Sequence, residues 1–540
     1  MIVGASDAVL LRMRDRGVTP GLRDVPLLLD VLEGTSDDDA EVAEKALLRL
    51  EKSNVPKAIP KIVARARAAV RPGRGRLTRL LGRFADQNEA RAFLLAVVRD
   101  DDPKTRRTAA RALAKLPKAD DITQALLVAW DQAASEDDRR ALAEPLGKAG
   151  SPEARARLAL LQEGAATEET ARKAGRAVVM LGRELARAAT GAIDPQKALD
   201  VPVVVRFHTR AGLETILEDE LGVAWRPRVA GPGVVEARLE GPLAGALAIR
   251  TALEVGFPLE PARGEDIAAT IVGALRTDRA KRVFRTYQGE GPARFRLAFA
   301  GTGGRGKGER RALAWRVAEL AQEKGASDLV NDPHAATWEV LVEESEGGVA
   351  LEIVPRGYED TRFAYRQKQV PASSSPVLAA ALARVAPRRD DDVVWDPFVG
   401  AGSELVERAW LGPAATLIGT DLEPKALEAA KTNLAAAKVK ATLVLADATH
   451  FTPDVAPTLV LTNPPMGRRV QRGAHVDVLG RFVEHAANLL RPGGALVLPV
   501  PEPGRFHDRA VRAGLVLDRA WTIDMGGFPA ALSVFRKGTA

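Results

Sequence analysis

Residues 392–403 read DVVWDPFVGAGS, and this stretch decides the fold of the C-terminal third of the chain. The apolar run 393–395 predicts a buried strand, and Gly400 and Gly402 predict a tight turn into a helix. Glycines there let the backbone approach a ligand that a Cβ would exclude. The spacing is not that of a dinucleotide phosphate loop, and taken alone the turn could be a plain strand-to-helix connection.

Further apolar runs follow at helix-sized intervals, in the stretches ATLIGTDLEP, ATLVLADAT, PTLVLTNPP and GALVLPVPE. Strict alternation of strands and helices predicts a parallel, doubly wound α/β sheet of the Rossmann-like kind. In such sheets a ligand binds beyond the carboxyl ends of the strands. The residues that follow each run are therefore the candidate site residues.

Acidic residues end three of these predicted strands, at Asp396, Asp421 and Asp447. A carboxylate at Asp421 suits the two hydroxyls of a ribose, and Asp447, followed by Ala448, suits an adenine amino group. The alternative is that each aspartate only caps a helix. Three acidic strand ends in register favour a binding site.

The loop Asn463-Pro464-Pro465-Met466 follows the fourth predicted strand. An asparagine side-chain oxygen and a neighbouring carbonyl can both accept hydrogen bonds from an N–H₂ group, and the prolines make the loop rigid. These bonds would aim the nitrogen lone pair at an electrophilic methyl group, so catalysis would rest on positioning and on relief of developing charge. Such chemistry needs neither a covalent intermediate nor a metal.

Residues 1–190 contain a repeat in which a leucine is followed two positions later by a basic residue. The repeated pairs are Leu47/Arg49, Leu81/Arg83, Leu113/Lys115, Leu146/Lys148 and Leu181/Arg183. A spacing of 32–35 residues, with a second helical stretch in each interval, favours an all-α solenoid that resembles short HEAT-like repeats. A plain helical bundle remains open. The basic residues could be solvated helix ends or an RNA-contacting stripe.

Residues 200–365 alternate β-branched runs such as VVVRF, GVVEARL, RFRLAFA, ATWEVLVEE and VALEIVP with helical stretches. The helical stretches include GLETILEDEL, PLAGALAIRTALE, IAATIVGALR and RALAWRVAELAQE. This order predicts α+β domains with mixed sheets. A Gly/Pro/Asp-marked linker at 190–200 and a Pro/Ser-marked joint at 368–376 delimit the region, and the Rossmann-like domain occupies 370–540.

AGLETILEDELG and the following pattern through VGFPLEP resemble the ferredoxin-like portion of THUMP-containing RNA methyltransferases, and RFRLAFAG through IVPRG resembles the THUMP module. DPFVGAGS, GTDLEP, LADAT and NPPM, in this order, resemble the amino-methyltransferase branch of class I S-adenosylmethionine enzymes. The resemblance is to guanine-N2 methyltransferases of tRNA and rRNA. It implies that S-adenosylmethionine is the cofactor and that RNA is the partner.

The same resemblance implies a role for each motif residue. Asp396, Phe398, Gly400 and Gly402 would line the methionine end of the cofactor, Asp421 the ribose, and Asp447 with Ala448 the adenine. The target base would lie against residues 463–466. The fourth loop position is usually aromatic and stacks on the base, but here it is Met466. The candidates to replace that stack are Phe451, Phe482 and Phe528.

Two clusters of basic residues are candidate RNA contacts. One is a predicted Gly-rich loop within 303–311 that holds Arg305, Lys307, Arg310 and Arg311, although an inert hairpin tip is an equal alternative. The other directly follows the NPPM loop and comprises Arg468, Arg469 and Arg472.

The composition excludes several classes of protein. The chain has no cysteine, so disulfides, thiolate metal sites and a catalytic thiol are excluded. It has a net charge of +7, which favours a polyanionic partner. We expect no signal peptide, no membrane span and a cytoplasmic protein. The N-terminal repeats could hold a protein partner. The alternatives left open are adenine-N6 methylation, protein-glutamine methylation and a catalytically idle RNA-binding scaffold.

Overall fold

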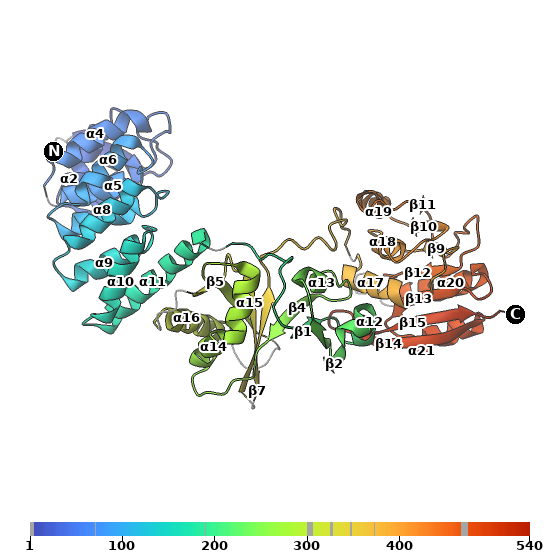
Figure 1. Ribbon diagram of the computed structural model, residues 1–540. Coiled ribbons are helices and arrows are strands. Elements are labelled where there is room, and N and C mark those ends of the chain that lie inside the picture. Colours follow the sequence, from blue (N-terminus) through green and yellow to red (C-terminus); the bar gives the residue numbers. More distant parts are fainter. Residues whose placement is uncertain are drawn as a thin grey trace. The chain divides into compact units, whose positions relative to one another are not determined.

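The computed structural model describes residues 5–70, 72–189, 191–299, 306–323, 328–345, 348–371, 373–465 and 474–539 (Figure 1). The chain divides into two compact units. One unit comprises 1–190, 291–294 and 305–335, and the other comprises 191–290, 295–304 and 336–540. Within the described residues, no helix combines the length and the apolar character that crossing a membrane requires.

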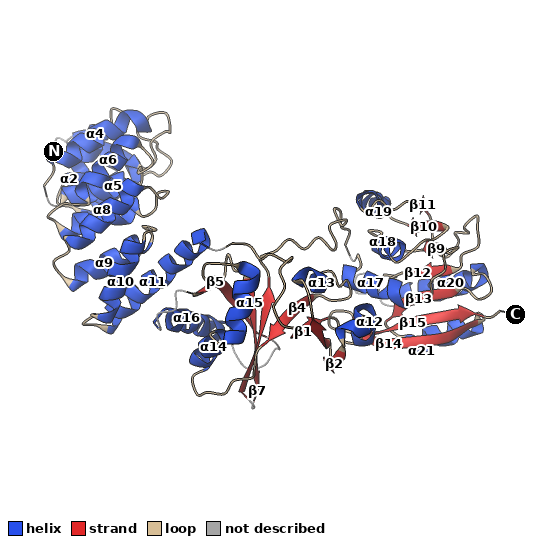
Figure 2. Cartoon of the chain, in the orientation of Figure 1, coloured by secondary structure: helices blue, strands red, loops and turns tan. Residues whose placement is uncertain are grey.

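The N-terminal part of the first unit is helical throughout its regular elements (Figure 2). Its helices are α1 (Ala5–Met13), α2 (Val25–Glu33), α3 (Asp37–Leu47), α4 (Val55–Ala68), α5 (Gly73–Leu81), α6 (Asn88–Val97), α7 (Pro103–Leu113), α8 (Asp120–Asp131), α9 (Glu136–Gly147), α10 (Pro152–Glu163) and α11 (Glu168–Ala189). Helix α6 contacts both α4 and α8. In the same way α7 contacts α5 and α9, and α9 contacts α11. The all-helical prediction is confirmed.

The leucine repeat corresponds to one structural position in every second helix. Leu47, Leu81, Leu113, Leu146 and Leu181 lie on the odd-numbered helices α3 to α11, and each is at most 1% exposed. Arg49 donates to the Met13 and Asp15 carbonyls, and Arg183 donates to the Asn331 carbonyl. These two repeat arginines therefore bind backbone oxygens within the unit.

The helical pairs are also joined by ion pairs between residues about one repeat apart. Arg79 binds Glu44, and the buried Arg106 binds Asp138. The first unit also contains α16 (Lys307–Glu323) and β6 (Leu329–Asn331), which both contact α11. Arg187 of α11 pairs with the buried Asp332 at 2.6 Å.

The second unit begins with a mixed sheet. Its strands in this unit are β1 (Val203–His208), β2 (Arg228–Gly231), β3 (Val234–Leu239), β4 (Glu254–Pro258), β5 (Ala293–Phe299), β7 (Trp338–Ser345) and β8 (Gly348–Pro355), in the order β2-β3-β1-β4-β8-β7-β5. Neighbouring strands are antiparallel, except that β5 and β7 are parallel. With α12 (Glu214–Leu221) and α13 (Leu243–Leu247), β1 to β4 follow the β-α-β-β-α-β order of a ferredoxin-like fold.

Three helices of the middle region differ from the prediction. Helix α13 ends at Leu247, although 242–254 reads as helical, because the Arg250 and Thr251 N–H groups donate to the Glu220 carboxylate instead. Helix α15 (Asp278–Gln288), which follows α14 (Ile267–Leu275), was not predicted. The predicted loop at 303–311 is wrong from Lys307 on, because these residues begin α16. Glu309 accepts from the Gly306 N–H at 2.7 Å, a bond typical of a helix N-terminus.

The C-terminal sheet has the order β11-β10-β9-β12-β13-β15-β14. Its strands are β9 (Val393–Asp396), β10 (Thr416–Asp421), β11 (Thr442–Leu445), β12 (Leu459–Leu461), β13 (Ala495–Val500), β14 (Leu515–Asp524) and β15 (Pro529–Lys537). The five strands β9 to β13 are parallel, as the alternation predicts. The hairpin β14–β15 adds two antiparallel pairings that the alternation does not predict.

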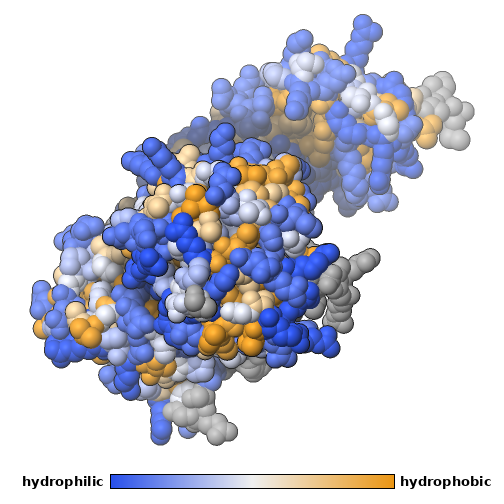
Figure 3. Space-filling model, turned by 90° about the vertical axis from the view of Figure 1, so that its right-hand side faces the viewer, coloured by the Kyte–Doolittle hydropathy of each residue, from blue (hydrophilic) through white to orange (hydrophobic). Residues whose placement is uncertain are grey.

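Helices cover both faces of this sheet. Buried residues of α17 (Pro376–Val385), α18 (Ser403–Trp410) and α19 (Pro424–Ala436) share one core, and those of α20 (Ala474–Leu489) and α21 (Pro503–Arg512) share another. The doubly wound prediction is confirmed. On the face shown in Figure 3, orange hydrophobic residues form scattered patches among hydrophilic ones.

The ferredoxin-like part packs on the C-terminal sheet within the second unit. Leu213 and Ile216 belong to the same buried core as Ile523. A Cβ on Gly212 would lie 1.9 Å from the Thr522 carbonyl oxygen, so the two backbones approach too closely for any side chain. Arg250 forms two 2.7 Å hydrogen bonds to Glu407. The core of the C-terminal sheet therefore includes residues that precede 370.

Candidate active site

Four predicted site residues lie along one edge of the C-terminal sheet. Asp447 follows β11, Asp421 ends β10, Asp396 ends β9 and Asn463 follows β12, and these four strands are adjacent and parallel. Because the carboxyl ends of parallel strands share an edge, residues up to 67 positions apart in the chain lie at the same edge. The structure thus brings together the motifs that the sequence separates.

Asp396 is the most buried member of this edge. Its Oδ1 accepts from the Thr462 hydroxyl at 2.7 Å and from the Phe398 N–H at 3.2 Å. Its Oδ2 is buried with no hydrogen-bond partner among the described residues. Complete burial, together with the nearby Glu404 carboxylate, raises the pKa of Asp396 well above its usual value. A cationic ligand group at Oδ2 would satisfy this oxygen and relieve the repulsion.

Gly400 and Gly402 both adopt left-handed backbone conformations, with φ of 49° and 79°. A Cβ on Gly402 would lie 3.3 Å from the Ala430 Cβ, whereas a Cβ on Gly400 would meet only the Phe398 carbonyl oxygen at 3.9 Å. The space beside Gly400 is therefore open. The Gly400 N–H donates to Asp421 Oδ2 at 2.9 Å, so the glycine turn and the second acidic strand end are in contact.

Asp447 is partly exposed at the end of the row. Its Oδ1 accepts from both the N–H and the hydroxyl of Thr449 at 2.8 Å. The backbone N–H of Thr449 is the main cause of the lowered pKa of Asp447, which favours the ionised carboxylate. The adjacent Ala448 is buried.

The Phe398 ring packs edge-on against Phe482, with centroids 5.2 Å apart.

Asn463 is partly buried, and its two amide atoms differ. Nδ2 donates to the Ser374 hydroxyl at 2.8 Å, whereas Oδ1 is buried without a partner in the described part of the chain. A buried acceptor without a partner costs about 1–3 kcal/mol, so this oxygen is prepared to accept from a ligand N–H. Pro464 is buried and Pro465 is exposed. Met466 lies outside the described residues.

Two residues that sequence reasoning missed complete the Asn463 environment. Ser374, just before α17, also donates to the carboxylate of Glu404 on α18, and both are buried. Burial raises the pKa of Glu404 to about 7. No local pattern marks either residue.

The three phenylalanines considered as replacements for an aromatic residue at position 466 lie in different surroundings. Phe482 is fully buried and contacts Trp395 and Phe398, so its predicted stacking role is wrong. Phe528 lines a shallow cavity with Ala211 and Gly212, on the β14–β15 hairpin. Phe451 follows Asp447 closely and is only partly buried, against Trp395.

The predicted RNA contacts are only partly described. Lys307 and Arg311 are exposed, and Arg310 is partly buried, on the first turns of α16. Arg305, Arg468, Arg469 and Arg472 lie outside the described residues. Among the described residues there is also no group of three His, Cys, Asp or Glu side chains that could hold a metal ion.

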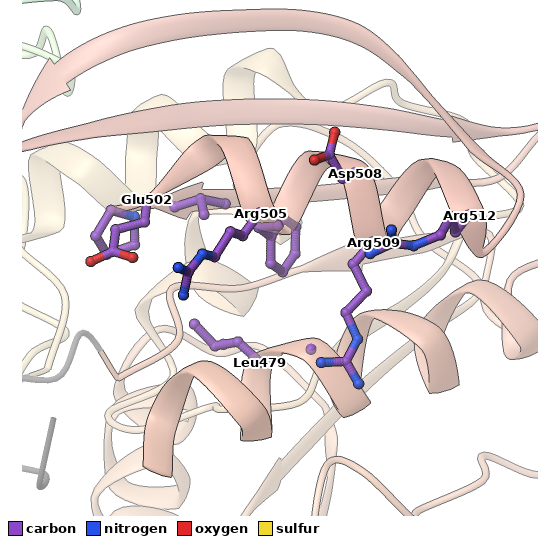
Figure 4. Close-up of a pocket in the computed structure, with 10 residues that line it drawn as sticks. Leu479, Glu502, Arg505, Asp508, Arg509 and Arg512 are labelled. Carbon is purple, nitrogen blue, oxygen red and sulfur yellow. The ribbon is translucent and has the colours of Figure 1, made fainter. Parts of the chain in front are cut away.

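A cavity of about 290 Å³ lies between α20 and α21, next to the carboxyl end of β13. In Figure 4, Arg505 and Arg509 extend from α21 toward α20, where Leu479 lies, whereas Asp508 points to the other side. Arg509 pairs with Glu484 at 2.6 Å. None of the motif residues that the structure describes is among the residues lining this cavity.

The parallel strands β9 to β13 and the row of residues at their carboxyl ends fit a Rossmann-like domain. Residues 364–519 match the RMKL-like methyltransferase domain family. This match covers less than a third of the chain, and it coincides with the sheet that carries the candidate site.

Three similar proteins extend this comparison. The tRNA (guanine(6)-N2)-methyltransferase of Thermus thermophilus is 35% identical over 171 residues, which are 31% of this chain and 50% of that protein. The U6 snRNA (guanine-N(2))-methyltransferase THUMPD2 of Bos taurus is 27% identical over 140 residues, which are 25% of this chain and 27% of that protein. The crystal structure of TrmN from Thermus thermophilus superimposes with a TM-score of 0.48 and 26% identity, over 62% of this chain and 99% of that one. The aligned regions span half or less of the two curated relatives.

Proposed function

We propose that this protein is an S-adenosylmethionine-dependent RNA methyltransferase that modifies an exocyclic base amine, guanine N2 in tRNA or rRNA. The observation that carries the proposal is the row Asp447, Asp421, Asp396 and Asn463 along one sheet edge, with the Asn463 Oδ1 buried and without a partner among the described residues. The similarity of part of this chain to two guanine-N2 methyltransferases supports the same base.

The residues at this edge fit the proposed cofactor. Asp396 Oδ2 is a buried carboxylate oxygen that a cationic amino group would satisfy, and the open space beside Gly400 admits a close ligand. Asp421 retains acceptor capacity beyond its two backbone N–H bonds, and this capacity suits the ribose hydroxyls. S-adenosylmethionine supplies an already activated methyl group.

Asn463 provides the chemistry on the substrate side. Its Oδ1 accepts an N–H of the base amine, which orients the nitrogen lone pair and stabilises the positive charge that develops on nitrogen. The buried Pro464 limits movement of the loop. The reaction therefore depends on a positioned acceptor and needs no covalent enzyme intermediate.

The other regions have roles in the same proposal. Residues 200–365 form a ferredoxin-like and THUMP-like region that docks RNA for the domain at 370–540. Residues 1–190 are HEAT-like repeats and provide a surface for a protein partner. The proposed location is the cytoplasm.

One experiment tests the function directly. The purified protein, residues 1–540, is incubated with tRNA or rRNA and S-adenosylmethionine carrying a labelled methyl group, and the nucleosides are resolved by mass spectrometry. We expect label in N2-methylguanosine. Label in N6-methyladenosine would indicate the adenine alternative, and no transfer to RNA would favour the protein-glutamine alternative or the idle scaffold.

The RNA-docking part has its own test, which uses the exposed cations of α16. The variant Lys307→Gln/Arg311→Gln should weaken RNA binding. It should also make the slope of log affinity against log salt concentration shallower by about one to two, since each lost phosphate contact removes about 0.7–0.9 from that slope. The control Lys57→Gln/Lys61→Gln removes two exposed charges from α4. Equal RNA affinity of the two variants would contradict the docking role of α16.

A further inference from the structure

Three elements that are distant in the chain meet in one hydrogen-bond chain beneath the Asn463 loop. Asn463 Nδ2 donates to Ser374 Oγ at 2.8 Å, and the Ser374 hydroxyl donates to a carboxylate oxygen of Glu404. Ser374 is 9% exposed and Glu404 is 3% exposed. Ser374 precedes α17, Glu404 lies in the first turn of α18, and Asn463 follows β12 (Figure 1).

The hydrogen count fixes the direction of this chain. A serine hydroxyl has one hydrogen, and an ionised carboxylate can only accept, so Ser374 must use its hydrogen on Glu404. Ser374 can then only accept from Asn463, and this places the amide N–H₂ on the serine side. The amide oxygen is left as the buried atom without a described partner. This is the orientation in which Asn463 can accept from a substrate amine.

We propose that Ser374 and Glu404 are positioning residues that hold the Asn463 amide with its oxygen toward the substrate amine, and that protonation of Glu404 reverses this orientation. The inference rests on the proposed function, because it concerns the orientation that amine methylation needs. Neither residue contacts the reacting atoms, since both act through Asn463.

Protonation of Glu404 permits the reversal, because a carboxyl group can donate a hydrogen that a carboxylate does not have. A protonated Glu404 donates to Ser374 Oγ, and the serine hydrogen is then free to donate to Asn463 Oδ1. The amide turns so that its N–H₂ faces the substrate, where it opposes the N–H groups of the amine. Because a donor cannot accept these hydrogens, the protonated form is inactive.

The groups around Glu404 bring its protonation into a pH range in which the reaction can be measured. Asp396 of β9 and Glu407 of α18 are carboxylates near it, and Tyr365 also faces it, whereas Arg366 opposes them with a positive charge. Burial is the largest cause, and it raises the pKa of Glu404 to about 7. The ionised, active orientation therefore grows as the pH rises through 7.

The first test compares single-turnover methylation rates at saturating RNA and cofactor. Ser374→Ala should lower the rate about tenfold to a hundredfold, because the acceptor of the Asn463 amide and its link to Glu404 are both lost. Ser374→Thr keeps the hydroxyl and should restore most of the rate. The control is Ser375→Ala, since the Ser375 side chain makes no capping hydrogen bond. Cofactor affinity should change less than about twofold in all three variants.

The second test is the pH profile of the same rate. The wild-type rate should rise about tenfold per pH unit below 7 and level off above it, and Glu404→Gln should remove this slope because it cannot ionise. A Ser374→Ala variant at the wild-type rate, or a Glu404→Gln variant that keeps the wild-type slope, would overturn the inference while leaving the proposed function intact. A wild-type protein that methylates no base amine would instead refute the proposed function.

The pH dependence of the unfolding free energy, which needs neither RNA nor cofactor, shows whether Glu404 changes its protonation state in this pH range. A carboxyl group whose pKa is raised by folding binds more protons in the native state, so stability falls as the pH rises from about 4.5 to about 7. The difference in unfolding free energy between Glu404→Gln and wild type should therefore grow over this window. A difference that stays constant would contradict the titration.

Discussion

The Gly400 N–H donates to Asp421 Oδ2 at 2.9 Å, and this bond joins the glycine turn after β9 to the acidic end of β10. The bond holds the carboxylate in place while leaving it further acceptor capacity. It also places the open side of Gly400 next to the residue that the proposal assigns to the ribose.

Gly400→Ala should test whether a ligand occupies that space. A Cβ at this position meets little of the protein, so the folding cost should be limited to the left-handed backbone, about 1–2 kcal/mol. Cofactor affinity should fall at least tenfold if the cofactor lies against the turn. Gly514→Ala is the matched control, because Gly514 also has a positive φ, 84°, and open space around it. Titration calorimetry and thermal unfolding separate the two effects.

Asp421→Ala should weaken cofactor binding by about 1.5–3 kcal/mol, since it removes the acceptor for the ribose hydroxyls. RNA affinity should stay close to wild type, because phosphate contacts elsewhere dominate it. The exposed Asp454→Ala provides a control for the loss of one charge. Unchanged cofactor affinity in calorimetry would remove Asp421 from the site.

Glu407→Gln should destabilise the second unit by about 3–5 kcal/mol, because it leaves the Arg250 guanidinium partly buried without its counter-charge. Arg250 also stacks on Phe363 and Trp410, so it cannot easily turn to solvent. The double variant Arg250→Met/Glu407→Gln removes both charges and keeps an acceptor for the Tyr365 hydroxyl. Denaturant unfolding should show it to be more stable than the single variant. A single variant more stable than the double variant would contradict this account.

The sequence predicts the edge residues because their signal is local. Asp396, Asp421 and Asn463 follow short apolar runs, and the parallel topology places such ends together whatever the packing details. Ser374 and Glu404 could not be predicted, because their roles depend on contacts across 89 and 30 residues of chain. The burial that raises the pKa of Glu404 is likewise a tertiary property.

Other differences between the predicted and the observed fold also have specific causes. Strand–helix alternation gives no reason to expect the β14–β15 hairpin, although Gly526 and Gly527, both at φ 96°, mark its turn. Helix α13 is short because Glu220 captures the Arg250 and Thr251 N–H groups, an interaction that local propensity does not contain. The division of the chain also departs from simple linear segments, since 305–335 groups with the N-terminal helices.

The central claim is that Asn463 positions an exocyclic base amine for methyl transfer. The most direct measurement is the single-turnover rate of Asn463→Ala on purified target RNA, with the product identified by mass spectrometry. We predict a rate lower by about 10²–10³, with N2-methylguanosine as the wild-type product and with cofactor and RNA affinities nearly unchanged. A full-speed Asn463→Ala protein, or a wild-type product methylated on a ring carbon or a ribose oxygen, would contradict the account.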